Sequence, residues 1–232
     1  MNFSKLSILV VASLMVTSCS NDRALKAKAK ELAQKFIITD GHIDTPWKLS
    51  KNYEDISLRT KTGDFDYVRA KEGGLDVPFM AIYIPSSYLE TGGAKEKADS
   101  LIDMMEQIAD KDPDKFEIAY SLADANRIFK EGKVALPLGM ENGAGIEDDI
   151  SNLKHFYDRG IRYITLTHSK DNLICDSSYD EEEDTWGGLS PYGRKVVKEM
   201  NRLGVMVDIS HVTDEVINQV LDMTDVPVVA TH

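Results

Sequence analysis

The sequence predicts an α/β fold in which parallel strands alternate with helices and curl into a TIM-like (β/α)8 barrel. Three observations support this prediction. Six apolar runs of strand length alternate with segments of helical periodicity. Five of these runs end in a side chain that can bind a metal or transfer a proton. The sixth run ends on the last residue, so we expect a barrel that is truncated after its sixth strand.

The N-terminal segment has the features of an export signal. Lys5 precedes an apolar run from Leu6 to Val16, which is too short to span a bilayer comfortably. The following Val-Thr-Ser-Cys19 resembles a bacterial lipobox, in which the cysteine becomes the lipid-modified first residue. A plain signal peptide with an incidental cysteine is the alternative. The chain then divides into a lipoprotein signal peptide, a tether with a first helix, and an incomplete barrel domain, at residues 1–18, 19–34 and 35–232.

The composition, 42% hydrophobic and 28% charged, is that of an ordinary soluble globular protein. A formal charge of −12 argues against a nucleic-acid partner, because phosphate backbones attract basic surfaces. Only two cysteines are present, Cys19 and Cys175. If Cys19 carries lipid, Cys175 has no intrachain partner and becomes an ordinary loop or core residue. We therefore predict a lipoprotein held by Cys19 on the periplasmic or cell-surface side of a membrane.

The first barrel strand, Phe36 to Asp44, carries the first candidate ligands. Residues i and i+2 of a strand share a face, so His42 and Asp44 point the same way. An imidazole beside a carboxylate supplies most of a metal site. A surface histidine next to a turn aspartate is the simpler alternative. The charged segment from Trp47 to Gly74 has little periodicity and is predicted to be a long loop.

The next elements carry no candidate ligand. Leu75 to Ile84 is an apolar strand, and Gly92-Gly93 separates it from a helix over residues 94–110. A capping box at Ser121–Asp124 opens a further helix.

Three later strands each end in a residue of catalytic type. They cover Val134 to Glu141, Ile161 to His168 and Val205 to His211. Helices from Ile150 to Gly160 and from Pro191 to Leu203 separate them.

The last helix begins at Thr213, and a sixth strand over residues 227–232 ends in His232. A lone histidine is usually just solvated or hydrogen-bonded, but several strand ends in phase argue for one shared site, because the carboxyl ends of parallel strands meet on one face. His155 lies mid-helix and is predicted to be structural. Asp208 points away from the face of His211 and is not assigned as a ligand. The candidate site residues are His42, Asp44, Glu141, His168, His211 and His232.

Seven motifs occur in the following order: His42-Ile-Asp44, Met140-Glu141, Tyr163–His168, Gly188–Gly193, Val197–Gly204, Asp208–His211 and Ala230–His232. Together they resemble the motifs of the renal (membrane) dipeptidase family of zinc peptidases, family M19. The resemblance runs from about residue 36 to the end and corresponds to the N-terminal two thirds to three quarters of the family's barrel. One departure is Asn142, where many members have glycine.

The resemblance implies a barrel of the metal-dependent hydrolase type with two zinc ions. His42 and Asp44 would hold one zinc, and Glu141 would bridge it to a second zinc completed by His211 and His232. A hydroxide shared by the two ions would attack the peptide bond of a dipeptide, perhaps one with a D-residue at its C-terminal side.

Protonated His168 would bind the substrate and stabilise the tetrahedral intermediate, so Glu141 and His168 are the catalytic candidates that the resemblance implies. An acid that the family carries on a late strand has no counterpart in this sequence.

The sequence therefore predicts an exported, lipid-anchored zinc dipeptidase. Two alternatives stay open: an inactive or partial lipoprotein that binds metal or peptide without turnover, and another binuclear hydrolase that opens amides, lactams or lactones. A homodimer also stays open. From the sixth strand's position we expect the 232 residues alone to be an inactive fragment of a longer gene product.

Overall fold

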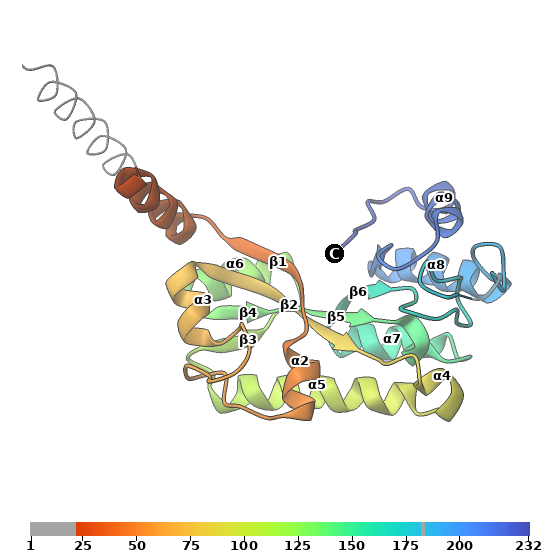
Figure 1. The fold of residues 1–232 in the computed structure, drawn as a ribbon, viewed down its shortest axis with the longest axis horizontal. Coiled ribbons are helices and arrows are strands. Elements are labelled where there is room, and N and C mark those ends of the chain that lie inside the picture. Colours follow the sequence, from red (N-terminus) through yellow and green to blue (C-terminus); the bar gives the residue numbers. More distant parts are fainter. Residues whose placement is uncertain (1–21, 182–183) are drawn as a thin grey trace, which may run out of the picture.

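The centre of the molecule is a curled sheet of five parallel strands (Figure 1). The computed structural model describes residues 22–181 and 184–232, so the predicted signal peptide and Cys19 lie outside the described residues. The strand order is β1-β2-β5-β6-β7, and each neighbouring pair is parallel. This curled parallel sheet, a half-barrel, confirms the predicted fold class. The strands are β1 Ile38–Ile43, β2 Leu75–Tyr83, β5 Leu138–Glu141, β6 Ile161–Thr165 and β7 Met206–Asp208.

The sixth predicted strand, residues 227–232, joins the sheet at a single residue. Val229 forms a parallel bridge with Asp208. The Val229 amide donates to the Val207 carbonyl at 3.0 Å, and the Ile209 amide donates to the Val229 carbonyl at 2.8 Å. The predicted place of this segment beside β7 is confirmed, but its predicted length as a strand is wrong.

Helices pack on the outer face of the sheet, and apolar side chains fill the layer between. Leu101 and Met105 of α5 belong to one buried cluster with Met80 and Ile82 of β2. Residues 22–35 form a further helix ahead of β1. The helices are α2 Thr45–Lys51, α3 Tyr67–Gly73, α4 Tyr88–Thr91, α5 Ala94–Lys111, α6 Leu122–Lys130, the 3-10 helix η1 Gly143–Ile146, α7 Ser151–Asp158, α8 Pro191–Leu203 and α9 Asp214–Met223.

The prediction of a continuous loop from Trp47 to Gly74 is wrong, because α2 extends into its start and α3 lies within it. Each has only seven residues, which is too short to display a helical period. For α3, the capping residues carry the signal instead. The Asp66 side chain accepts from the Arg69 amide at 2.8 Å, and Gly74 ends α3 with φ 84°.

The single strand predicted from Val134 to Glu141 is in fact two strands. Pro137, which has no amide hydrogen for a sheet ladder, separates β4 (Val134–Leu136) from β5. Strand β4 pairs with β3 (Phe116–Ile118), which the sequence analysis missed, in a separate two-stranded parallel sheet. The break leaves only the last four residues, ending in Glu141, in the central sheet.

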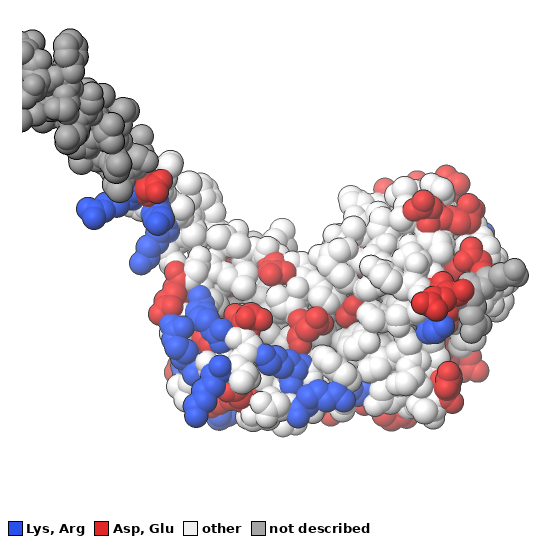
Figure 2. Space-filling view, in the orientation of Figure 1, with Lys and Arg blue, Asp and Glu red and all other residues white. Residues whose placement is uncertain are grey.

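The charged side chains are unevenly distributed over the surface. Figure 2 shows Lys and Arg gathered over the region of α2, α3 and α5, whereas Asp and Glu dominate around α8 and α9. Lys51 and Lys97 both lie over the Trp47 ring, with their Nζ atoms 4.1 and 5.2 Å from its centroid. Within the described ranges, no helix has the length and apolar character needed to cross a membrane.

Candidate metal centre

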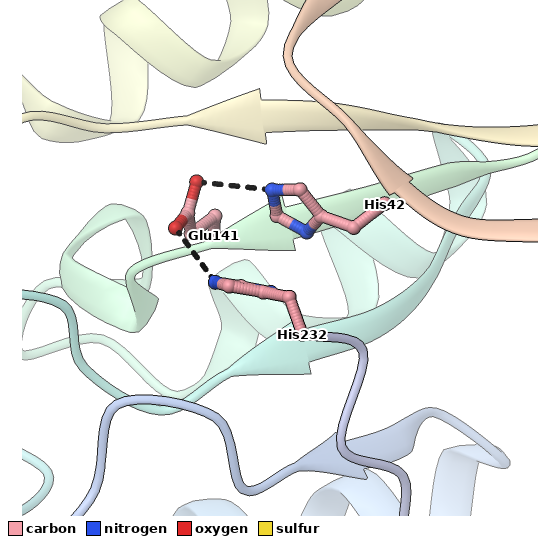
Figure 3. A group of neighbouring side chains, drawn as sticks. All are labelled: His42, Glu141 and His232. Carbon is pink, nitrogen blue, oxygen red and sulfur yellow. Dashed lines mark ion pairs between the residues drawn. The ribbon is translucent and has the colours of Figure 1, made fainter.

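The carboxyl edge of the curled sheet brings together side chains from distant parts of the chain. His42 lies near the end of β1, and Glu141 is the last residue of β5. His168 and His211 each follow their strands by three residues, because β6 and β7 are shorter than predicted. His232 follows the Val229 bridge. Figure 3 shows His42 and His232 approaching Glu141 from different segments.

Glu141 is the common neighbour of the four histidines. Its side chain is 6 % exposed, so its carboxylate is almost completely withdrawn from water. Its Oε2 lies 3.3 Å from His42 Nε2. On the other oxygen, Oε1 lies 3.1 Å from Nε2 of His211, 3.5 Å from that of His232 and 3.6 Å from that of His168. Each carboxylate oxygen therefore faces imidazole nitrogen.

Two groups of three side chains could each hold a metal ion. In each group the ligand atoms all lie within 4.8 Å of one another. Glu141 belongs to both groups, as a bridging carboxylate would. The groups are His42, Glu141 and His232, and Glu141, His168 and His211.

Asp44 lies at the rim of this arrangement. Its side chain is 65 % exposed, and its Oδ1 lies 3.5 Å from His42 Nε2. It belongs to neither group. Asp44 also precedes α2 as the N-cap residue, but its side chain makes no capping hydrogen bond, so the carboxylate is available to a ligand.

The electrostatics favour an ionised glutamate among the imidazoles. Burial raises the pKa of Glu141, but hydrogen bonds from His211 and His42 outweigh it and lower the pKa to about 2. Burial works against the charged form of His42, but hydrogen bonds with Asp44 and Glu141 raise its pKa to about 9. The site therefore holds one positive charge beside Glu141, the position that a cation would take.

His168 differs from its predicted protonated form. Burial lowers its pKa, and the neighbouring charges of His211 and His232 act in the same direction, although Glu141 opposes them. At neutral pH His168 is a neutral imidazole, so any hydrogen bond that it gives to a substrate comes from an uncharged N–H. Its ring lies 4.8 Å from that of Tyr83.

The residues present fit a zinc site. Neutral imidazoles and carboxylates are the nitrogen and oxygen ligands that zinc accepts. Within the described part of the chain, the Nδ1 atoms of His168 and His211 are buried and have no hydrogen-bond partner. Both rings turn the other nitrogen, Nε2, towards Glu141, so Nε2 is the atom that each ring offers to an ion at the centre.

Unusual backbone conformations flank the ligands. Asn142 has φ 76° and His211 has φ 69°, both in the left-handed region that few non-glycine residues adopt. The Asn142 amide donates to the Ile84 carbonyl at 2.9 Å, and its Oδ1 accepts from the Ala144 amide at 3.2 Å. Because glycine and asparagine both tolerate this conformation, Asn142 can replace the family's glycine here.

Sequence analysis missed a residue that contacts His42. The Tyr163 hydroxyl lies 2.8 Å from His42 Nδ1, the ring nitrogen turned away from Glu141. Burial raises the pKa of this phenol, so it remains protonated. Tyr163 stood within a quoted motif, but only His168 at the end of that motif was given a role. His155, in contrast, pairs with Asp99 at 2.7 Å in a network between α5 and α7.

The chain matches the family described as membrane dipeptidase (peptidase family M19) over residues 26–232. It is 34% identical over 220 residues to an uncharacterised dipeptidase of Schizosaccharomyces pombe. That match covers 88% of this chain and 54% of the relative. It is also 30% identical over 220 residues to dipeptidase 3 of Mus musculus, covering 91% and 44% of the two chains. The chain thus spans about half the length of the curated relatives it matches.

Solved structures share the fold. The probable dipeptidase PvdM from Pseudomonas aeruginosa superimposes with a TM-score of 0.81 at 28% identity, over 90% of this chain and 55% of that chain. A metallo peptidase from Rhodobacter sphaeroides, liganded with a phosphinate mimic of the dipeptide L-Ala-D-Ala, gives a TM-score of 0.74 at 26% identity. That match covers 85% of this chain and 65% of the other.

Proposed function

Because the chain belongs to the membrane dipeptidase family, peptidase family M19, we propose that it hydrolyses dipeptides at a binuclear zinc centre. One observation carries the proposal most directly: Glu141 is shared by two groups of histidines. The Rhodobacter sphaeroides protein bound to a mimic of L-Ala-D-Ala supports a substrate with a D-residue at the C-terminal side.

In this proposal, His42 and Asp44 would hold one ion, His211 and His232, whose Nε2 atoms lie 2.8 Å apart, would hold the other, and Glu141 would be shared between them. This division differs from the two groups described above, which place His232 with His42 and His168 with His211. When bound, two such ions would supply a water whose pKa is lowered towards about 7, and they would polarise the carbonyl oxygen of the dipeptide. The bridging carboxylate offsets repulsion between the cations.

His168 has a separate role in substrate binding. It lies beside Glu141 and Tyr83 and is neutral at neutral pH. A neutral imidazole can donate an N–H to the carbonyl oxygen of the scissile bond as negative charge develops there. Its partial burial excludes part of the competing water.

The test combines metal content with turnover. The purified chain is stripped with a chelator, titrated with zinc and assayed with Gly-D-Ala. Binding of about two ions with hydrolysis would support the proposal and would contradict the expectation that the 232 residues alone are inactive. His155→Ala is the matched control, because it removes a histidine away from the centre and should leave zinc content unchanged.

Two zinc ions without dipeptide hydrolysis would favour a metal-binding protein or a different amide hydrolase, which assays with β-lactams and lactones would separate. Failure to bind zinc at all would contradict the proposal.

A further inference from the structure

A fully buried carboxylate, Asp208, lies behind the candidate metal centre and joins three segments of the sheet. Its Oδ1 accepts from the amide and hydroxyl of Ser210 at 3.0 and 2.8 Å and from the Thr231 amide at 3.2 Å. Its Oδ2 accepts from the hydroxyls of Thr165 and Thr231 at 2.6 and 2.7 Å. With five donors around it, Asp208 has no oxygen free for a metal ion.

The hydrogen on Thr231 determines which nitrogen of His232 carries a proton. A hydroxyl has one hydrogen and two acceptor lone pairs. The Thr231 hydroxyl donates its hydrogen to Asp208 Oδ2 at 2.7 Å. Thr231 Oγ1 also lies 2.9 Å from His232 Nδ1, and this second bond must therefore run from Nδ1–H to Oγ1.

A proton on Nδ1 leaves the Nε2 lone pair of His232 free. That nitrogen faces Glu141 Oε1 at 3.5 Å and His211 Nε2 at 2.8 Å, so it is the atom that points into the centre. Metal-binding histidines commonly donate their other N–H to a carboxylate or another acceptor, which fixes the ring and its tautomer.

On the opposite edge of the sheet, the Tyr163 hydroxyl lies 2.8 Å from His42 Nδ1 and can accept a hydrogen bond from it.

We propose that Asp208 and Thr231 are positioning residues that fix the Nδ1–H tautomer of His232, so that its ring presents Nε2 to the metal. This inference rests on the proposed function for the identity of the ligand. The tautomer itself can be measured without any metal.

The decisive measurement is the side-chain 15N spectrum of the histidines in the chelator-treated full chain at pH 8. Burial lowers the pKa of His232, so the ring is neutral at this pH and its tautomer is visible. The His232 signals are assigned by their loss in His232→Gln. We expect the Nδ1–H form; an Nε2–H form in the unsubstituted chain would overturn the proposal.

Asp208→Asn should reverse the direction of the two hydrogen bonds that join residue 208 to Thr231 and Thr231 to His232. The introduced amide can donate to Thr231, whose hydroxyl then donates to His232 Nδ1 and shifts the ring to the Nε2–H form. Thr231→Val should lose the preference, and Thr231→Ser, which keeps the hydroxyl, should retain it. Asp66→Asn is the matched control, because it makes the same change at another fully buried aspartate, and should leave the tautomer unchanged.

Zinc affinity gives a second readout. Asp208→Asn and Thr231→Val should weaken binding about 10- to 100-fold, the range for partners of ligating histidines, while Thr231→Ser and Asp66→Asn remain within about threefold. Unchanged tautomer and affinity in Asp208→Asn would refute the positioning role even if the chain binds zinc. The expected His232 tautomer in a chain that binds no zinc would support the network and contradict the proposed function instead.

Discussion

Glu141 and His168 lie 3.6 Å apart but have different assigned roles, which metal analysis can separate. Glu141→Ala should remove most of the bound zinc, because it deletes the only side chain common to both groups. His168→Ala should retain the zinc and lose turnover. Zinc content measured after dialysis checks this, and equal loss of zinc in both variants would contradict the assigned roles.

Gly139 allows Tyr163 to lie beneath the metal centre. A Cβ at this position would lie 2.1 Å from the Tyr163 ring, and the ring is confined by the sheet. Gly139→Ala should therefore lower the free energy of unfolding by about 1–3 kcal/mol, as overpacking does, and weaken zinc binding through His42. Urea unfolding and zinc titration measure both effects.

Gly73→Ala is the control, because a Cβ at Gly73 meets no atom within 4 Å. It should be neutral or slightly stabilising, since it lies in the last turn of α3. A similar loss of stability in both variants would show that the contact with Tyr163 is unimportant.

The sequence alone predicts most of the candidate ligands, but it does not predict the residues that hydrogen-bond to them. Glu141 and the four histidines end or follow apolar runs, so the parallel topology alone predicts their convergence. Tyr163 and Thr231 acquire roles only through hydrogen bonds between strands that are far apart in sequence. No local sequence pattern encodes such a network. The alternation of side chains along the strand excluded Asp208 as a ligand, but it did not indicate which groups hydrogen-bond to its carboxylate.

At the scale of elements, Asp66 anchors α3. Its buried carboxylate accepts from the amides of Arg69 and Thr60 and pairs with the Arg69 guanidinium at 2.7 Å. Burial opposes ionisation, but these partners lower the pKa of Asp66 below its usual 3.8. A lowered pKa means that the stabilisation is present above about pH 4 and is lost as the pH falls further.

Asp66→Asn should cost about 2 kcal/mol at pH 7, because it weakens a cap and a buried ion pair. It should also reduce the loss of stability between pH 5 and pH 3. Urea unfolding at the three pH values measures both. Asp64→Asn, at an exposed neighbour, should change stability by less than about 0.5 kcal/mol; an equal effect there would rule out the capping role.

The accuracy of the predicted element boundaries depended on how clear the local end signals in the sequence are. Helix α8 has the predicted bounds, Pro191 to Leu203, because proline opens it and Gly204 closes it with φ 79°. Strands β6 and β7 stop earlier than predicted, because their last residues leave the ladder to form the turns that carry His168 and His211. An apolar run indicates burial, but it does not indicate where sheet hydrogen bonding ends.

At the scale of the whole molecule, the lipid anchor remains a proposal, since Cys19 lies outside the described residues. Cys19→Ala should move the protein from the membrane fraction to the soluble fraction or block its processing, because no thiol remains for the lipid. Ser20→Ala is the control and should stay membrane-bound. Cell fractionation with immunoblotting measures both, and unchanged fractionation of Cys19→Ala would argue against the lipobox.

The two edges of the sheet meet at the metal centre without sharing a strand pair. Strand β1 and the Val229 segment lie at opposite ends of the strand order, yet the rings of His42 and His232 are 4.3 Å apart. Two ions that share Glu141, one bound by His42 and the other by His232, would link the two edges and keep the curvature of the sheet. Free zinc at 1,000 times its Kd would then stabilise the native state by about 4 kcal/mol. Chelation should speed amide hydrogen exchange more in β1 and around Val229, at the two edges, than in β5 at the centre of the sheet. The free energy of unfolding would then depend on the zinc concentration around the protein.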